Sequence, residues 1–190
     1  MKKKRGKLFV FSAPSGSGKT TIIKNVLKKF PEFIFSVSAT TRKKRHYEID
    51  GKDYFFLTEE EFKKKIEQNE FIEWEKTYDY YYGTLKSFVK DNVENGKSVV
   101  LEVDVKGALK IKSAYPDAVL IFITPPSIEE LKIRLKNRKT ETDEDFKKRI
   151  ERAKMELSFK DKFDYNVVNE NLKDAEKQVF EIIKNELKEL

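Results

Sequence analysis

One stretch of the chain has residue types and a spacing that suit phosphate binding: Ala13-Pro14-Ser15-Gly16-Ser17-Gly18-Lys19-Thr20. The two glycines allow the backbone to curl so that successive N–H groups point into one concavity. Lys19 can reach the β- and γ-phosphates of a nucleotide, and the Thr20 hydroxyl can ligate Mg²⁺. An apolar run before the loop and a helical pattern after it predict a nucleoside triphosphate site, with the helix dipole adding to phosphate binding.

A second group of residues could bind another phosphate and a base. Arg42 and Arg45 are three positions apart, so both guanidinium groups can converge on one phosphate. Further along the chain, Tyr54 offers a hydroxyl donor. Residues 69–74 and 80–84 then supply a carboxylate, a phenol and a small hydroxyl.

Strand and helix signals alternate along the chain that must position these groups. Continuous apolar runs predict buried strands at 8–11, 98–103 and 119–123, with shorter strands at 33–37, 54–57 and 165–168. Apolar stripes and capping signals predict helices at 20–29, 58–66, 127–137, 143–159 and 174–187. This order predicts an α/β fold of three layers, with a central mostly parallel sheet and right-handed crossovers.

Asp104 follows the predicted strand at 98–103 directly. An acidic residue just past the end of a buried strand can help to place Mg²⁺ or its waters.

Residues 36–88 differ from the rest, because they are rich in aromatic and charged residues and have little of the buried-strand pattern. We expect this segment to be an insertion folded over the sheet edge within a single domain, 1–190.

The composition excludes several classes of protein. The 190 residues contain no cysteine, which excludes disulfides and thiolate metal sites. No apolar run is long enough to span a bilayer, and the basic start of the chain leads into the phosphate loop rather than a signal peptide, so we expect no membrane partner and a cytoplasmic location. The net charge of +7 has no contiguous basic stripe with interleaved aromatics, so we expect no nucleic-acid partner.

Taken in order, these motifs strongly resemble those of the guanylate kinases. The resemblance extends from Leu8 to the last predicted helix and is carried by the loop S-x-P-S-G-x-G-K-[ST], then V-S-x-T-T-R, D-G-K-D-Y-x-F, N-E-F-I-E-W, Y-Y-G-[ST], L-x-V-D-x-x-G and a P-P-S turn. It implies a P-loop NTPase fold with a core at 1–35, 89–136 and 151–190, a nucleoside monophosphate (NMP)-binding insertion at about 36–88 and a short lid at about 137–150.

The resemblance also implies an activity, transfer of the γ-phosphate of ATP to GMP, with dGMP as a second substrate and Mg²⁺ as cofactor. The implied ATP-binding residues are Ala13, Pro14, Ser15, Gly16, Ser17, Gly18, Lys19, Thr20, Thr21 and Asn169. The implied GMP-binding residues are Ser38, Arg42, Arg45, Tyr54, Glu73, Tyr82, Thr84 and Glu102, with Glu73 accepting from guanine N1–H and N2–H₂. The implied catalytic residues are Lys19, Arg42, Arg134, Arg138 and Arg149, and the implied Mg²⁺ residues are Thr20 and Asp104.

The chain departs from the family pattern in a few places. Ala13 stands where the loop usually has glycine, and Glu102 replaces a shorter aspartate, so its contact with the base is direct or through water. Lys44 and the pair His46-Tyr47 replace prolines and a glycine around Arg45, which leaves that arginine less rigidly held. We expect a monomer or a small homo-oligomer.

Other functions remain open at this point. A catalytically inactive guanylate-kinase-like module that binds phosphopeptides is the main alternative. Such modules typically lose the loop lysine or the ATP-site arginines, whereas Lys19, Thr20, Arg138 and Arg149 are all present here. A kinase for another nucleoside monophosphate is a further alternative, and Glu73 with Ser38 and Thr84 argues against it.

Overall fold

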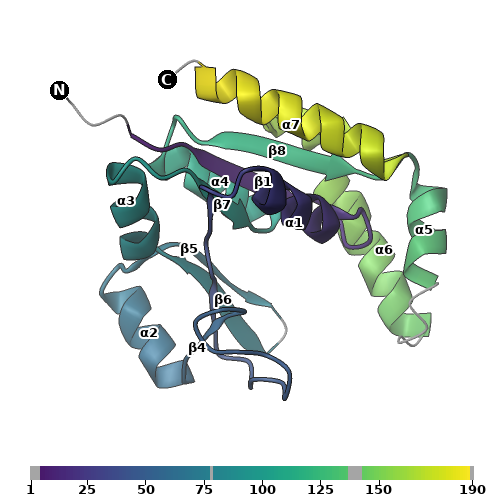
Figure 1. Cartoon of the computed structure of the whole chain (residues 1–190). Helices are drawn as coiled ribbons and strands as arrows, with labels where there is room; N and C mark the ends of the chain where they lie inside the picture. The colour runs from purple at the N-terminus through teal and green to yellow at the C-terminus, as the bar shows by residue number, and fades with distance from the viewer. Residues whose placement is uncertain (1–4, 78, 137–142, 189–190) are drawn as a thin grey trace.

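The computed structural model describes residues 5–77, 79–136 and 143–188 (Figure 1). The strands are β1 (Leu8–Ser12), β2 (Ile34–Phe35), β3 (Ala39–Thr40), β4 (Phe55–Phe56), β5 (Phe71–Thr77), β6 (Tyr80–Leu85), β7 (Val99–Glu102), β8 (Val119–Thr124) and β9 (Tyr165–Val168). The helices are α1 (Lys19–Lys29), α2 (Glu59–Glu67), α3 (Lys86–Glu94), α4 (Val105–Ala114), α5 (Ile128–Lys136), α6 (Asp143–Leu157) and α7 (Leu172–Lys188), with a 3₁₀ turn at Lys160–Lys162.

The central sheet is parallel, with the strand order β2-β7-β1-β8-β9 among the described residues. β1 lies in its middle, where Phe9 is in register with Val100 on one side and Val119 on the other. β1 and β8 are buried along their whole length, which explains why both are continuous apolar runs in the sequence. The predicted α/β fold with a mostly parallel sheet is therefore confirmed.

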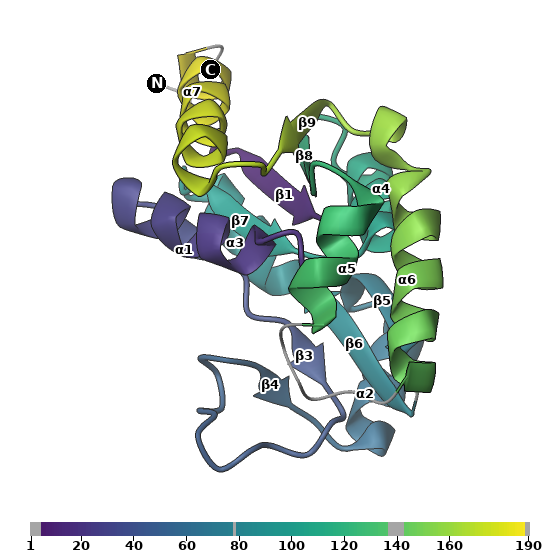
Figure 2. The ribbon, with the colours of Figure 1, turned by 90° about the vertical axis from the view of Figure 1, so that its right-hand side faces the viewer.

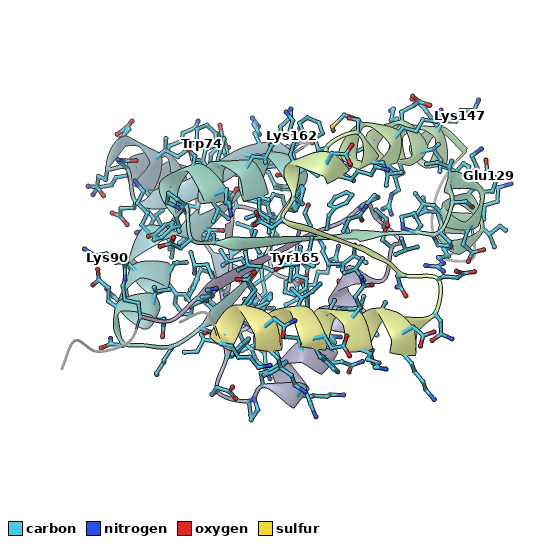
Figure 3. The ribbon with its side chains drawn as sticks, turned by 90° about the horizontal axis from the view of Figure 1, so that it is seen from above. Trp74, Lys90, Glu129, Lys147, Lys162 and Tyr165 are labelled. Atoms are coloured by element: carbon cyan, nitrogen blue, oxygen red, sulfur yellow. The ribbon has the colours of Figure 1, made fainter. Side chains whose placement is uncertain are left out.

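Helices cover both faces of this sheet (Figures 2 and 3). α1 and α7 pack on one face, around Phe9, Phe11 and Ile121. α3 and α4 pack on the other face, around Val10 and Leu120. In Figure 3 the sheet, with Tyr165 on β9, runs between α7 in yellow and the teal and green helices.

The carboxyl ends of the parallel strands meet at one edge of the sheet, and most of the expected ATP-site residues lie there. The phosphate loop follows β1, and Asn169 follows β9. Glu102 is the last residue of β7, and residues 103–104 come directly after it. Open parallel sheets bind ligands at this edge because the strand ends leave a crevice between the helices. The fold thus brings together segments that are far apart in the sequence.

Residues 39–85 form a second sheet, in the order β4-β3-β6-β5, which lies below the central sheet in Figure 1. β5 and β6 form an antiparallel hairpin, with an irregularity between Phe71 and Glu73. α2 covers this sheet through Phe62, whose ring stacks on Phe71 at 4.3 Å. The predicted capping box of α2 is present, because Thr58 Oγ1 accepts from Glu61 N at 3.1 Å and Thr58 N donates to Glu61 Oε2.

α5 and α6 form a separate small core through Leu131, Leu135, Ile150 and Ala153. The expected lid at about 137–150 falls partly in α6, while 137–142, with Arg138, lies outside the described residues. The division of the chain into core, insertion and lid stays a prediction. No helix in the described ranges combines the length and the apolar character that crossing a membrane would need.

Candidate active site

The loop between β1 and α1 has the curled backbone that its glycines predict. Gly16 and Gly18 have φ angles of 93° and 88°, in the left-handed region. Gly18 has a second constraint, because a Cβ atom there would lie 2.3 Å from Nδ2 of Asn169. α1 begins at Lys19, so the positive end of the helix dipole lies at the loop.

Asn169, which follows β9 at the same edge of the sheet, holds the loop in place. Its Nδ2 donates to the carbonyl oxygen of Ser17 at 2.8 Å, and its backbone N–H donates to Thr124. Only 5% of the residue is exposed. Its side chain therefore braces the loop, and contact with the ATP base, which the resemblance implies, stays a prediction.

Lys19 and Thr20 converge on the end of β7. Lys19 Nζ lies 3.6 Å from Glu102 Oε1 and 3.4 Å from the Val103 carbonyl oxygen. The Thr20 hydroxyl donates to the same Glu102 oxygen at 3.2 Å. Glu102, which we expected in the base pocket, thus also contacts the phosphate loop.

Asp104 caps α4, and its Oδ1 accepts from Gly107 N at 2.7 Å. Thr20, Glu102 and Asp104 together offer a hydroxyl and two carboxylates beside the loop, which is the oxygen chemistry that Mg²⁺ prefers. In the described ranges no cluster of three or more acidic, His or Cys side chains could hold a metal ion. A hydroxyl and two carboxylates fit an ion that keeps several of its waters, and binding of Mg²⁺ at this position stays a prediction.

A cavity of about 430 Å³ surrounds the phosphate loop. Its lining includes residues 13–21 together with Glu102, Asp104, Arg149, Arg152 and Glu156. The loop residues predicted to bind ATP, including Thr21, all line this cavity. We call it the ATP-side cavity.

One face of α6 presents charged groups to the ATP-side cavity. Arg149 donates to Ser15 Oγ at 3.4 Å. Arg152 donates from Nε to Glu156 at 3.0 Å, and its Nη2 lies 3.7 Å from Glu75 and 3.9 Å from Asp104. Sequence reasoning missed Arg152 and Glu156, since a charged helix face gives no signal of what it faces.

Burial and charge act against each other within this group. Burial raises the pKa of Glu156, although its hydrogen bond to Arg152 opposes that rise. Burial lowers the pKa of Arg152, but the hydrogen bond to Glu156 and the charges of Glu156, Glu75 and Asp104 raise it overall. Arg152 therefore stays cationic between carboxylates that line both sides of the site.

A second cavity of about 390 Å³ opens toward the β5–β6 hairpin, and we call it the GMP-side cavity. Lys19, Thr20, Glu102 and Asp104 line both cavities. The remaining lining comprises Phe35, Ser38, Asp53, Tyr54, Glu73, Glu75, Tyr82, Gly83 and Val103. The two cavities thus meet at the phosphate-loop lysine and threonine.

Glu73 is a buried acid on the wall of the GMP-side cavity, with 7% of the residue exposed. The Thr84 hydroxyl donates to its Oε1 at 2.6 Å, and a Cβ on Gly107 would lie 2.9 Å from Oε2. Burial raises the pKa of Glu73 to about 7, against the opposing effect of the Thr84 hydrogen bond. The hydrogen bond from Thr84 therefore holds the Glu73 carboxyl group in place.

Tyr54 and Tyr82 face each other on the same wall, with ring centroids 6.2 Å apart. The Arg42 guanidinium carbon lies 5.5 Å from the centre of the Tyr54 ring. Arg42 is bonded to Glu48 at both terminal nitrogens, at 3.1 and 2.6 Å. Arg45 is exposed and donates to the Tyr47 hydroxyl at 2.9 Å, and convergence of the two arginines on one phosphate stays a prediction.

Arg134, like Arg42, Arg45, Thr84 and Asn169, is an expected site residue that is not part of the lining of either cavity. Its Nε donates to Glu130 at 2.8 Å and its Nη2 to the Asn169 carbonyl oxygen at 3.1 Å. It supports the segment that braces the loop. A catalytic role for Arg134 stays a prediction, as does one for Arg138, which lies outside the described residues.

Comparison with known proteins gives one consistent family. A family model described as guanylate kinase matches residues 5–186. The chain is 53% identical over 182 residues to the guanylate kinase of Thermotoga maritima, covering 96% of this chain and 88% of that protein. It is 50% identical to that of Caldanaerobacter subterraneus subsp. tengcongensis, covering 95% and 88%. The crystal structure of guanylate kinase from Anaplasma phagocytophilum matches with a TM-score of 0.76 at 31% identity, covering 97% of this chain and 87% of that one.

Proposed function

The chain belongs to the guanylate kinase family, and we propose that its two cavities bind ATP and GMP side by side for direct phosphoryl transfer. The protein is a nucleoside monophosphate kinase, which converts ATP and GMP to ADP and GDP. One observation carries the assignment of the site: Lys19 and Thr20 line both cavities, so a donor phosphate on the loop faces an acceptor across them.

In the proposed reaction an oxygen of the GMP phosphate attacks the γ-phosphorus of ATP in line, and the bond to the ADP oxygen breaks. Backbone N–H groups of the loop and the ammonium of Lys19 hold the donor phosphates. Arg149, on the opposite wall, adds a second cation where charge spreads over the transferring group. No covalent enzyme intermediate is needed, because positioning and charge stabilisation account for this type of transfer.

We propose that Glu73 reads the base. Its ionised carboxylate can accept from N1–H and N2–H₂ of guanine, while adenine offers no matching pair of donors. Ser38 and Glu102 line the same cavity and complete the pocket. A buried carboxylate left unpaired by the wrong base carries a desolvation cost, so discrimination of about 10⁴-fold is within reach of such a site.

We propose Mg²⁺ as the cofactor, with Thr20 and the second oxygen of Asp104, which also lies 3.9 Å from Arg152, reaching it directly or through water. When bound, the ion would neutralise phosphate charge. We also propose dGMP as a second substrate, because the contacts proposed here are to base and phosphate rather than to the ribose 2′-hydroxyl. A cytoplasmic location and a monomer or small homo-oligomer remain part of the proposal.

A coupled assay for ADP release tests the function, with GMP, AMP, UMP, CMP and dTMP as acceptors. We expect GMP to be strongly preferred, and equal rates with AMP and GMP would refute the guanine assignment. Lys19→Ala should lower kcat by a factor of about 10² or more, since it removes a cation present in the transition state. Exposed Glu60→Gln is the control and should match the wild type.

Glu73→Gln tests the base-reading role separately. The amide keeps one acceptor but presents a donor to a donor on guanine, so kcat/KM for GMP should fall by about 10² or more while the KM for ATP stays nearly constant. An unchanged KM and kcat for GMP would contradict the role of Glu73. Retained GMP binding by a wild-type protein that releases no ADP would favour the inactive module.

A further inference from the structure

Glu48 forms a fork-to-fork ion pair with Arg42. Its two carboxylate oxygens accept from Nη1 and Nη2 of the guanidinium, at 3.1 and 2.6 Å. Glu48 is 8% exposed, although it lies in a loop whose other residues from Lys43 to Tyr47 are exposed. A buried carboxylate inside an exposed loop needs a partner, and Arg42 is that partner.

The loop itself fixes Glu48 in place. Its side chain accepts a third hydrogen bond, from the backbone N–H of Arg45 at 2.8 Å, and its own N–H donates to the Arg45 carbonyl oxygen at 3.1 Å. The carboxylate is therefore held by a turn as well as by the ion pair. The hydrogen bond with Arg42 lowers the pKa of Glu48, so the group is ionised at neutral pH.

Glu48 and the Lys43 carbonyl oxygen occupy three of the five N–H groups of Arg42. Nη1 donates both to Glu48 and to the Lys43 carbonyl oxygen, at 3.1 and 2.9 Å, and Nη2 donates to Glu48. A guanidinium has five N–H groups, so the Nε–H and the second Nη2–H are left. These two point along the same side edge of the group, which is a bidentate phosphate-binding edge. In the described residues, the hydrogen bonds to Glu48 and Lys43 use only Nη1 and Nη2, and the Tyr82 hydroxyl is a further partner beside the guanidinium.

Aromatic rings fix the plane of the same guanidinium. Its central carbon lies 5.5 Å from the ring centre of Tyr54 and 5.9 Å from that of Phe56. Tyr82 is close enough for its hydroxyl to raise the pKa of Arg42, a smaller effect than that of Glu48. Tyr54 and Tyr82 line the GMP-side cavity, so Arg42 is held in a fixed orientation beside two phenols that can donate to the same anion.

We propose that Glu48 is a positioning residue for the acceptor phosphate. Its carboxylate binds Nη1 and Nη2 of Arg42, and the edge formed by Nε–H and the second Nη2–H is left for the phosphate of GMP. This inference rests on the proposed function. Two effects of Glu48 oppose each other, since its negative charge repels a phosphate while its geometry orients the cation that binds it. Bidentate recognition depends on orientation, and the negative charge is already paired with Arg42, so positioning outweighs repulsion.

Steady-state kinetics of Glu48→Gln and Glu48→Asp test the proposal. Glutamine has the same shape but turns an N–H donor toward Arg42, and aspartate is too short to reach Arg42 and the Arg45 N–H together. The KM for GMP should rise about tenfold or more in both variants, with the KM for ATP and the melting temperature nearly unchanged. Glu60→Gln removes the same charge from the same segment at an exposed site and should leave all three unchanged.

A double-mutant cycle separates positioning from general damage. A lysine cannot form the two parallel hydrogen bonds that a guanidinium forms with a carboxylate. In an Arg42→Lys background, Glu48→Gln should therefore change the KM for GMP by less than about twofold. A lower KM for GMP in Glu48→Gln would show that repulsion dominates and would overturn the proposal. An unchanged KM, or an equal rise for ATP and GMP, would overturn it as well. A wild-type protein that does not phosphorylate GMP would instead refute the proposed function.

Discussion

The carboxyl group of Glu73 connects guanine recognition to pH. Burial raises its pKa to about 7, so the unliganded protein holds a proton there below that pH. A protonated carboxyl turns an O–H donor toward the donors of guanine, so GMP needs the ionised form. Binding below pH 7 must therefore release this proton, whereas binding above pH 7 does not.

The KM for GMP should fall about tenfold per pH unit as the pH rises from 5 to 7, and should level off above 7. The phosphate of GMP also titrates, near pH 6. Glu73→Gln is the control for that second titration, because it has no carboxyl to ionise. If the wild type and Glu73→Gln show parallel pH profiles for GMP, Glu73 is not the titrating group.

Single residues also show which parts of the site could be predicted from the sequence. Lys19, Thr20, Tyr54, Glu73 and Tyr82 were predicted from their motifs, and each lines the cavity expected for it. Their placement agrees with the expectation because the chemistry of each residue is visible in a short local motif, while their roles as ligands stay predictions. Glu48 and Arg152 were missed because their roles depend on contacts that the sequence does not show. A turn brings Glu48 to Arg42, and Arg152 on α6 contacts Glu75 on β5.

At the level of elements, the junction of β9 and α7 supports the phosphate loop. Asn169 donates to the Ser17 carbonyl oxygen and leaves no room for a side chain at Gly18. Arg134 from α5 donates to the Asn169 carbonyl oxygen. Three elements thus position a loop that contains no regular structure of its own.

Asn169→Ala should therefore weaken ATP and GTP as phosphate donors to a similar extent. Loss of a buried hydrogen bond should also lower the free energy of unfolding by about 1–3 kcal/mol, measured by urea denaturation. The KM for GMP should change less than that for ATP. A variant with normal stability but an altered preference for ATP over GTP would show instead that Asn169 reads the base.

The β5–β6 hairpin shows why some elements were not predicted. β5 alternates between a buried and an exposed face, but its inward positions include Glu73 and Glu75 as well as Phe71. The period of a half-buried strand is read from apolar residues, so glutamates on the inner face hide it. β7 and β8 have wholly apolar cores and were predicted within one or two residues.

At the scale of the whole molecule, two cavities of about 430 and 390 Å³ share one wall. Lys19 and Thr20 come from the loop after β1, and Glu102 and Asp104 from the end of β7 and the start of α4. The sequence predicted both halves of this site from separate motifs. That they meet was implied only by the family resemblance, because the motifs themselves do not show that β1 and β7 are neighbours in the sheet.

A compound that links adenosine and guanosine through a chain of phosphates should occupy both cavities at once. Its second contact is intramolecular, so it should bind more tightly than ATP or GMP separately. At a concentration 100 times its Kd, it should add about 2.7 kcal/mol to the free energy of unfolding. For a chain of this size that is a rise of roughly 5–11 °C in Tm.

Differential scanning calorimetry with equal concentrations of the linked compound, ATP and GMP measures this effect. Lys19→Ala should lose most of the extra stabilisation, because Lys19 lies where the two cavities meet, while Glu60→Gln should keep all of it. If the linked compound raises Tm no more than ATP does, the cavities do not accept two nucleotides joined in line. Direct transfer between them would then be wrong, even if the protein phosphorylates GMP.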